Sequence, residues 1–281
     1  MQIFFIVGAQ KSGTTWLQRS LNSIEGVHCL GEGHFIDRLV QPFAETARSY
    51  NQMMQLVAER VYEGKAFYDA IPDSEFRQVM RQWILAILVR NVEANPDSIL
   101  AIGDKTPAHS HYIPTLHALF PEARFVHMLR DGRDVAVSAF HHQQRILRQL
   151  GQADPNASID TDAPDMLHKW AQFTRAVLKA EQAGQTMHTV RYEAMLSDPA
   201  QCLQACLNHI IPDQRWNPEV IQAAVDANSF RQQSGRPPGD SDTSAFLRKG
   251  QAGSWRTELQ PETLDQIQPD DRALLKQLGY D

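Results

Sequence analysis

The sequence has few of the residues that build cross-linked or metal-stabilised proteins. Its 281 residues include only three cysteines, Cys29, Cys202 and Cys206, and no cysteine–histidine group has the spacing of a metal site. No apolar run approaches the ~20 residues that span a bilayer. No basic segment or cleavage site accompanies the apolar residues 3–7, so a secretory signal is not expected. We therefore expect a cytoplasmic protein with reduced thiols, no metal and no membrane span.

Positive charge is also in deficit. The chain has 27 lysines and arginines against 33 aspartates and glutamates, which gives a net charge of −6. Binding to nucleic acid is therefore not expected to be its main activity. A small anionic ligand needs only a local basic site and stays compatible with this charge. With 42% hydrophobic and 21% charged residues, the composition is that of a soluble globular protein.

Short apolar runs alternate with helical patterns along the chain. We predict strands at residues 3–7, 99–103, 123–129 and 188–193, with helices following three of them from Thr14, Val135 and Leu203. This order favours an α/β fold with a parallel sheet covered by helices on both faces. Polar segments at 150–165 and 234–244 are predicted to be a surface loop or lid and a connector. We expect one domain, residues 1–281, with variable acceptor-binding insertions at about 35–80 and 141–170.

The loop after the first strand, GAQKSGTTWL at 8–17, almost matches a phosphate-binding P-loop. Thr14 occupies the position of the usual lysine, and the only lysine, Lys11, lies inside the loop. A glycine loop that opens a helix directs backbone N–H groups and the positive helix end at one anion, and Thr14 and Thr15 add hydroxyl donors. The early lysine suits a 5′-phosphate with one further anionic group better than a triphosphate with magnesium.

Two further segments carry the chemistry of phosphate sites. Arg130 ends the predicted strand 123–129, where open α/β sheets bind ligands, and Ser138 follows eight residues later. An ion pair between Arg130 and a neighbouring aspartate is the alternative interpretation. The segment FLRKGQAGSW at 246–255 adds two cations and two glycines. Three anion sites in one chain favour a ligand with more than one phosphate.

In this order, KSGTTWL, LRDGRDVAVSAFHH and RKGQAGSW resemble the sulfotransferases that use 3′-phosphoadenosine-5′-phosphosulfate (PAPS) and release adenosine 3′,5′-bisphosphate (PAP). The resemblance implies a P-loop-type fold, no metal, and transfer of a sulfuryl group to an acceptor. The segment VRYEAMLSDP is similar to the one that brings a tyrosine to the adenosine, although a Tyr–Arg contact between strands explains it equally well. The residues that the resemblance assigns to PAPS are Lys11, Ser12, Gly13, Thr14, Thr15, Trp16, Arg130, Ser138, Tyr192, Arg248, Lys249 and Gly250.

The resemblance also bears on the catalytic base. Many cytosolic sulfotransferases have the sequence K-T-H, in which histidine is the base, whereas this chain has DKTP and Pro107 replaces the histidine. The segment HCLGEGHF is similar to one in the Golgi-type tyrosylprotein and heparan-sulfate enzymes, and it places Glu32 at their glutamate. Glu32 is therefore the expected base, and His109 and His34 are the alternatives. Lys11 and Lys105 are expected to stabilise the charge of the transferred and leaving groups.

Two other functions are compatible with the same motifs. A sulfotransferase-like module could bind the nucleotide without transferring the sulfuryl group, and a P-loop kinase could use the glycine loop. The missing lysine after Gly13 opposes the kinase, and Glu32 opposes the inactive module. The segment between 35 and 80 is rich in aromatic residues, and the net negative charge opposes a polyanionic glycan as the acceptor. We expect a small-molecule or lipid-like hydroxyl, and a lipid, a small alcohol, a phenol and an acyl-chain hydroxyl are all compatible with the sequence.

Overall fold

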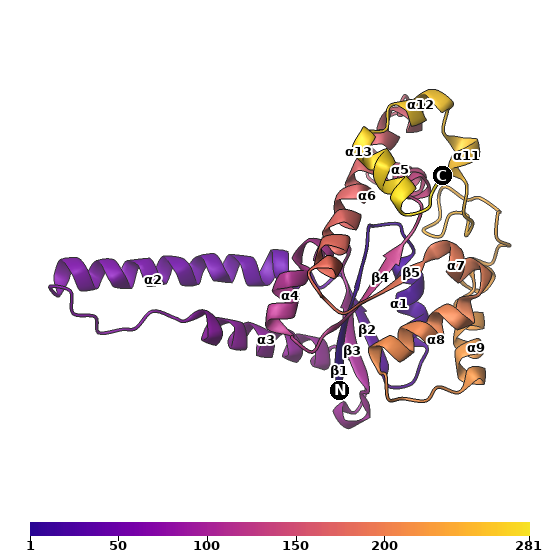
Figure 1. Ribbon diagram of the computed structural model, residues 1–281. Helices are drawn as coiled ribbons and strands as arrows, with labels where there is room; N and C mark the ends of the chain where they lie inside the picture. The colour runs from indigo at the N-terminus through magenta and orange to yellow at the C-terminus, as the bar shows by residue number, and fades with distance from the viewer.

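The computed structural model describes residues 1–281, and its centre is a sheet of five parallel strands (Figure 1). The strands are β1 (Gln2–Val7), β2 (Val27–Gly31), β3 (Ala101–Lys105), β4 (Arg124–Leu129) and β5 (Met187–Arg191). Their order across the sheet is β2-β3-β1-β4-β5. Five of the six residues of β1 are buried, as expected for a parallel strand that is covered on both faces. The predicted α/β fold with a parallel sheet is confirmed.

The strand register brings the predicted site segments to one edge of the sheet. The central strand β1 pairs with β3 and β4, and Ile6 lies opposite Lys105. On the outer side, β2 pairs with β3 so that Gly31 also lies opposite Lys105. The glycine loop after β1, the Glu32 segment after β2 and Arg130 after β4 therefore follow strands that end together, where open α/β sheets bind their ligands.

Two strands differ from the sequence-based expectation. β3 begins at Ala101 rather than at Ile99, because residues Pro96–Ser98 form the short 3₁₀ helix η2 and Ile99 caps it. The edge strand β2 was not predicted. Its five residues include His28 and Cys29 and end in glycine, so neither strict alternation nor a continuous apolar run marks it.

Helices cover both faces of the sheet. On one face, Leu17 and Leu21 pack with Leu203, Cys206 and Ile210 against the strands. The helices that supply this layer are α1 (Thr14–Asn22), α7 (Tyr192–Ser197), α8 (Pro199–Ile210) and α9 (Pro218–Ala227). The opposite face is covered mainly by α3 (Asp73–Arg90), α4 (Ile113–Leu119) and α6 (Ile159–Gln182). The 3₁₀ helix η3 (Pro107–Tyr112) connects β3 to α4.

A third apolar cluster lies next to the C-terminal end of β4. Trp170 of α6 is almost completely buried there with Val137 and Trp255. The elements of this cluster are α5 (Gly132–Gln149), α6, α11 (Trp255–Glu258), α12 (Pro261–Asp265) and α13 (Pro269–Gln277), and the short α10 (Phe230–Ser234) precedes the connector. The predicted loop at 150–165 is shorter than expected. Helix α6 begins at Ile159 and contains Pro164 as its sixth residue, an interior position at which proline removes one backbone hydrogen bond of the helix.

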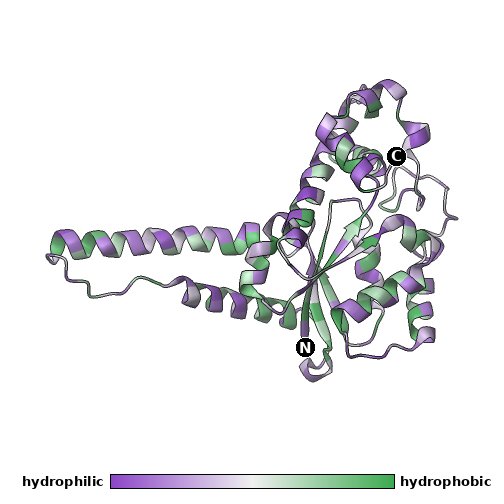
Figure 2. Cartoon of the chain, viewed as in Figure 1, coloured by the Kyte–Doolittle hydropathy of each residue, from purple (hydrophilic) through white to green (hydrophobic).

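Residues 41–83 form an arm that extends away from the sheet (Figure 1). A π-helix, η1 (Phe35–Val40), continues into α2 (Gln41–Val61), and an extended segment returns to α3. Figure 2 shows that hydrophobic residues dominate the strands, whereas hydrophilic and hydrophobic residues alternate along α2. None of the helices is long and apolar enough to cross a membrane.

Candidate active site

The glycine loop between β1 and α1 is packed so tightly that two positions admit only glycine. A Cβ atom on Gly8 would lie 2.4 Å from the carbonyl oxygen of Met128, and one on Gly13 would lie 2.7 Å from the ring of Tyr192. Both glycines have positive φ angles, 133° and 101°, which side chains rarely adopt. Inside the loop, the buried hydroxyl of Ser12 has no hydrogen-bond partner within the protein. The loop therefore offers an unused polar group to a ligand.

Lys11 lies at the centre of a group of cations. Its ammonium lies 4.7 Å from the centre of the Phe246 ring. Burial, followed by the charges of Arg145, Arg130 and Lys105, lowers the pKa of Lys11 to about 8. Such a cluster of like charges is unfavourable unless an anion joins it, so this geometry is suited to binding a phosphate or sulfuryl group.

Arg145 was not anticipated from the sequence. Its guanidinium lies 3.4 Å from Nδ1 of His142 and 6.0 Å from the centre of the Phe246 ring. It belongs to α5, seven residues after Ser138, and residues seven apart lie on the same face of a helix. This helical spacing is the signal by which it could have been found.

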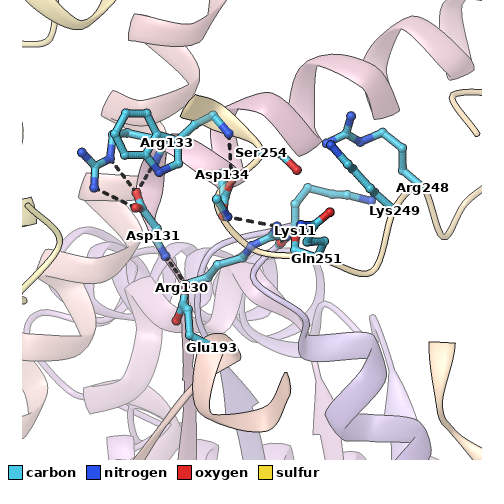
Figure 3. Close-up of polar contacts among 12 residues, drawn as sticks. Lys11, Arg130, Asp131, Arg133, Asp134, Glu193, Arg248, Lys249, Gln251 and Ser254 are labelled. Carbon is cyan, nitrogen blue, oxygen red and sulfur yellow. Dashed lines mark hydrogen bonds and ion pairs between the residues drawn. The ribbon is translucent and has the colours of Figure 1, made fainter. Parts of the chain in front are cut away.

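Arg130 connects three of the predicted segments (Figure 3). Its guanidinium donates to the backbone oxygens of Lys11, at 3.2 Å, and Gln251, at 3.1 Å. The same group lies 4.2 Å from the centre of the Tyr192 ring. Arg130 therefore holds the glycine loop, the C-terminal connector and α7 together. The alternative Tyr–Arg contact considered for Tyr192 is thus present, and Trp16 touches the same ring edge-on.

The aspartates beside Arg130 have structural partners of their own. Asp131 pairs with Arg133 at 2.8 Å, and Asp134 accepts hydrogen bonds from the backbone N–H groups of Gly253, at 2.6 Å, and Trp255, at 3.1 Å. Asp134 is only a distant partner of Arg130, at 3.8 Å. Asp134 therefore anchors the C-terminal segment, a role that sequence reasoning missed.

The C-terminal cations already have an acidic partner. Arg248 donates two hydrogen bonds to Glu258, at 2.8 and 2.9 Å, and Lys249 lies 3.8 Å from the same carboxylate. Although burial opposes ionisation of Glu258, hydrogen bonds from His141 and Arg248 lower its pKa to about 2. Ser138 is half-buried on α5 and makes no hydrogen bond through its side chain. The structure thus brings Lys11 and Arg130 together, whereas Arg248 and Lys249 face a glutamate.

Glu32 and Lys105 form an ion pair beside the cation group. The distance from Lys105 Nζ to Glu32 Oε1 is 2.6 Å, and the Lys105 side chain is only 6% exposed whereas that of Glu32 is 55% exposed. The backbone N–H of Glu32 also donates to the carbonyl of Lys105 at 3.0 Å. A carboxylate held next to a lysine, yet open to solvent, can accept a proton from an incoming molecule. A purely salt-bridging role for Glu32 is also compatible with this geometry.

The backbone around Glu32 is in an unusual conformation. Glu32 has φ 58° and His34 has φ 47°, values that cost energy in residues with side chains. Between them, the N–H of Gly33 donates to the carboxylate of Asp104 at 3.1 Å, and Thr106 donates to the same carboxylate at 2.5 Å. Asp104 is completely buried, and burial raises its pKa to about 6 despite these hydrogen bonds. Asp104 thus holds the strained loop in place.

The two alternative histidines occupy different environments. His109 is completely buried between Phe5 and Phe35, neither ring nitrogen has a hydrogen-bond partner, and burial lowers its pKa to about 4. This geometry gives no support for His109 as a base that meets an acceptor. His34 is more exposed and contacts Asp37 through Nδ1 at 2.9 Å.

An open cleft of about 600 Å³ lies on the outer side of β2. Gly31 and Gly33, which flank Glu32, are part of its wall, as is Asp104. The rest of the lining mixes apolar and polar side chains from β2, η1 and α3: Leu30, His34, Phe35, Arg38, Leu39, Ile87 and Asn91.

Comparison with known proteins agrees with the motifs. The model of the sulfotransferase family matches residues 3–214. The chain belongs to the sulfotransferase family. The enzyme class predicted from the three motifs, a PAPS-dependent sulfotransferase, is thereby confirmed. A relative from Caenorhabditis briggsae that is assigned to the protein-tyrosine sulfotransferases is 26% identical over 288 residues, covering 100% of this chain and 89% of that protein. Protein-tyrosine sulfotransferase 1 from Danio rerio is 26% identical over 224 residues, covering 79% of this chain and 56% of its own length.

Solved structures share the fold of this sulfotransferase. The sulfotransferase domain of the Synechococcus PCC 7002 olefin synthase superposes with a TM-score of 0.58 at 18% identity, covering 99% of this chain and 94% of that domain. Retinol dehydratase in complex with androsterone and PAP gives a TM-score of 0.53 at 20% identity, covering 98% of this chain and 80% of that protein. At these identities the likeness concerns the fold.

Proposed function

We propose that this sulfotransferase transfers a sulfuryl group from PAPS to an acceptor hydroxyl or amine, with Glu32 as the general base. One observation carries the proposal. The ion pair of Glu32 with Lys105, at 2.6 Å, lies at the same sheet edge as Lys11, whose pKa responds to both groups. A proton acceptor is thus found next to cations that suit a transferred anionic group.

The residues of the glycine loop fit the phosphosulfate end of PAPS. The unpaired hydroxyl of Ser12 and the unpaired Nε of Arg130 are buried donors, and Lys11 and Arg145 supply positive charge. Arg130 and Ser138 would hold the 3′-phosphate. Arg248 could join them only by leaving Glu258. When bound, PAPS supplies the sulfuryl group and PAP as the leaving group, and retinol dehydratase, which shares the fold, is known in complex with PAP.

The side chains would act by accepting a proton and by stabilising charge. Glu32 takes the acceptor proton as the acceptor oxygen bonds to sulfur, while the bond between sulfur and the leaving phosphate oxygen breaks. Lys11 and Lys105 stabilise the negative charge that builds on the leaving oxygen. In the free protein Lys105 neutralises Glu32. We infer that Lys105 turns toward the leaving oxygen during transfer, which releases the carboxylate to act as a base.

The acceptor is proposed to bind in the cleft beside Glu32. Its mixed apolar and polar lining suits a small or lipid-like molecule with one reacting hydroxyl. Two relatives are assigned to the protein-tyrosine sulfotransferases, so a tyrosine phenol in a peptide is the second acceptor class to test. The cytoplasmic location expected from the sequence stays a prediction.

The base is tested with Glu32→Gln, which keeps the size of the side chain but cannot accept the proton. The transfer rate constant should fall by about 10²–10⁴-fold, while the dissociation constant of PAP stays within about twofold because the glycine loop is unchanged. The matched control is Glu25→Gln, which removes the same charge at an exposed position and should change neither quantity. Full activity in Glu32→Gln would show that another group is the base.

Nucleotide competition separates the three candidate functions. Radiolabelled PAPS should transfer its label to an alcohol or a tyrosine peptide without magnesium, and PAP should compete much better than ATP. Binding of PAP without transfer to any acceptor would indicate an inactive binding module. Stronger competition by ATP, with a requirement for magnesium, would indicate a kinase.

A further inference from the structure

Helix α2 projects from the protein with almost no cover. Of its 21 residues, only Ala58 is buried, and at 1.5 Å per residue the helix is about 32 Å long. Its contacts lie on one side, where Asn51 exchanges two hydrogen bonds with the backbone of Ile71, at 3.0 and 2.8 Å, and Phe43 touches Trp83. A helix in water gains most of its stability from packing of an apolar face, so the opposite side of α2 lacks a partner.

That opposite side carries an apolar stripe, the α2 stripe, formed by Tyr50, Met53 and Leu56. These residues are 40%, 55% and 40% exposed. At about 100° per residue they lie within an arc of roughly 120°, whereas Asn51 and the buried Ala58 lie about 160° and 140° around the helix from Met53. Large apolar patches on a surface indicate an interaction site. Eleven of the eighteen large apolar side chains that are exposed in the whole protein belong to residues 43–83 of the arm.

We propose that the α2 stripe binds the same stripe of a second copy of this chain, with the two helices antiparallel about a two-fold axis near Met53. In such an interface, each residue meets its counterpart across the axis. Tyr50 and Leu56 lie three residues before and after Met53, so Tyr50 of each copy meets Leu56 of the other. Met53 faces its own copy.

The charges on the arm support a second copy rather than a strongly charged partner. Residues 41–83 contain six acidic and five basic side chains, which leaves a net charge of −1. Glu45 lies eight residues before Met53 and Arg60 seven residues after it, and neither makes an ion pair within the chain. The antiparallel arrangement places Glu45 of one copy next to Arg60 of the other. Helix α2 is not strongly basic, so it lacks the charge of helices that bind membrane surfaces.

The experiment measures the mass of the full-length protein by analytical ultracentrifugation over a range of concentrations. We expect a concentration-dependent dimer with twice the mass of 31.8 kDa. Met53→Glu places two like charges together at the axis and should weaken the dimer at least ~10-fold. The control, Gln52→Glu, adds the same charge one residue away on the polar side of the helix and should leave the mass unchanged. Circular dichroism and thermal unfolding check that both variants fold.

A charge exchange tests the antiparallel direction. Glu45→Arg and Arg60→Glu should each weaken the dimer, and the double variant should restore it, because the exchanged pair meets again across the axis. A protein that is monomeric at every concentration would overturn the proposal and would leave the stripe for a different protein. A dimer that tolerates Met53→Glu would also overturn it, as would single charge variants without effect. None of these outcomes depends on the reaction proposed above.

Discussion

Replacing Asp104 with asparagine should stabilise this sulfotransferase at neutral pH. Asp104 is completely buried, and its carboxylate accepts hydrogen bonds from Gly33 and Thr106. An asparagine can keep both contacts, because its carbonyl accepts from Gly33 and its NH₂ group donates to the hydroxyl of Thr106. The substitution therefore removes mainly the buried negative charge. The amide of asparagine is neutral at every pH, as the carboxyl group of Asp104 is when it is protonated.

The size of the effect follows from the pKa of Asp104. Burial raises it from 3.8 to about 6, against the opposing effects of Thr106, Gly33 and Lys105. At about 1.4 kcal/mol per pKa unit, ionisation of Asp104 costs the folded protein about 3 kcal/mol. The free energy of unfolding of the asparagine variant, relative to wild type, should thus be about 3 kcal/mol higher above pH 7 than below pH 4.

The direction of the pH dependence can be stated without measuring any other group. Between the unfolded and folded pKa values, the folded wild type binds more protons than the unfolded chain, so its stability falls as the pH rises through that window. Other titrating groups are common to both proteins, and their contributions cancel in the difference. About 1.5 kcal/mol of the difference should develop between pH 5 and pH 8.

The assay is urea unfolding of both proteins at several pH values in that range. Asp69→Asn, at an exposed aspartate of the arm, is the control and should give a difference that does not change with pH. If the difference between Asp104→Asn and wild type is the same at pH 5 and pH 8, the burial argument for Asp104 is wrong. A variant that loses stability relative to wild type as the pH rises would refute it as well.

Two further predictions concern the nucleotide site. Burial and neighbouring cations lower the pKa of Lys11 to about 8, so kcat/KM for PAPS should fall about tenfold between pH 7 and pH 9. Lys11→Arg should remove this decline. If the variant keeps the decline, deprotonation of Lys11 is not its cause. Arg130→Ala should reduce the preference for PAP over AMP by ~2–4 kcal/mol, measured by calorimetry beside the exposed control Arg215→Ala; an unchanged preference would remove Arg130 from the 3′-phosphate site.

The fold could largely be predicted from the sequence because most strands contain short runs of apolar residues that favour β-structure. The run in β1 has no polar interruption after Gln2, and β4 is interrupted only by His127. Each of these two strands is followed by a turn and a helix, so both the strand and its parallel pairing were evident. β2 was missed because an edge strand needs fewer apolar residues. The start of α6 was missed because Pro164 and several aspartates resemble a loop, although the aspartates of its first turn, Asp160 and Asp162, are favourable at the start of a helix.

The candidate site was only partly predictable, since motifs identify residue types and not their partners. The cations of RKGQAGSW predicted a phosphate site. In the structure, Arg248 instead pairs with Glu258, a residue outside the motif. Arg145 and Asp104 were not singled out: only the seven-residue spacing from Ser138 indicated Arg145, and no spacing indicated Asp104. Their importance depends on burial and on charges that come from other strands and helices, which one stretch of sequence cannot show.

The energetic costs in this protein are concentrated at one edge of the sheet. Lys11, Glu32 and His34 have positive φ angles there, and Lys11 and Asp104 carry buried charges whose pKa values move toward the neutral form. Strain and desolvation of this kind persist only where the surrounding structure enforces them. Here the enforcement comes from well-packed strands on either side. A bound polyanion would relieve the repulsion among the cations, so the nucleotide that reacts should also be the ligand that stabilises this edge.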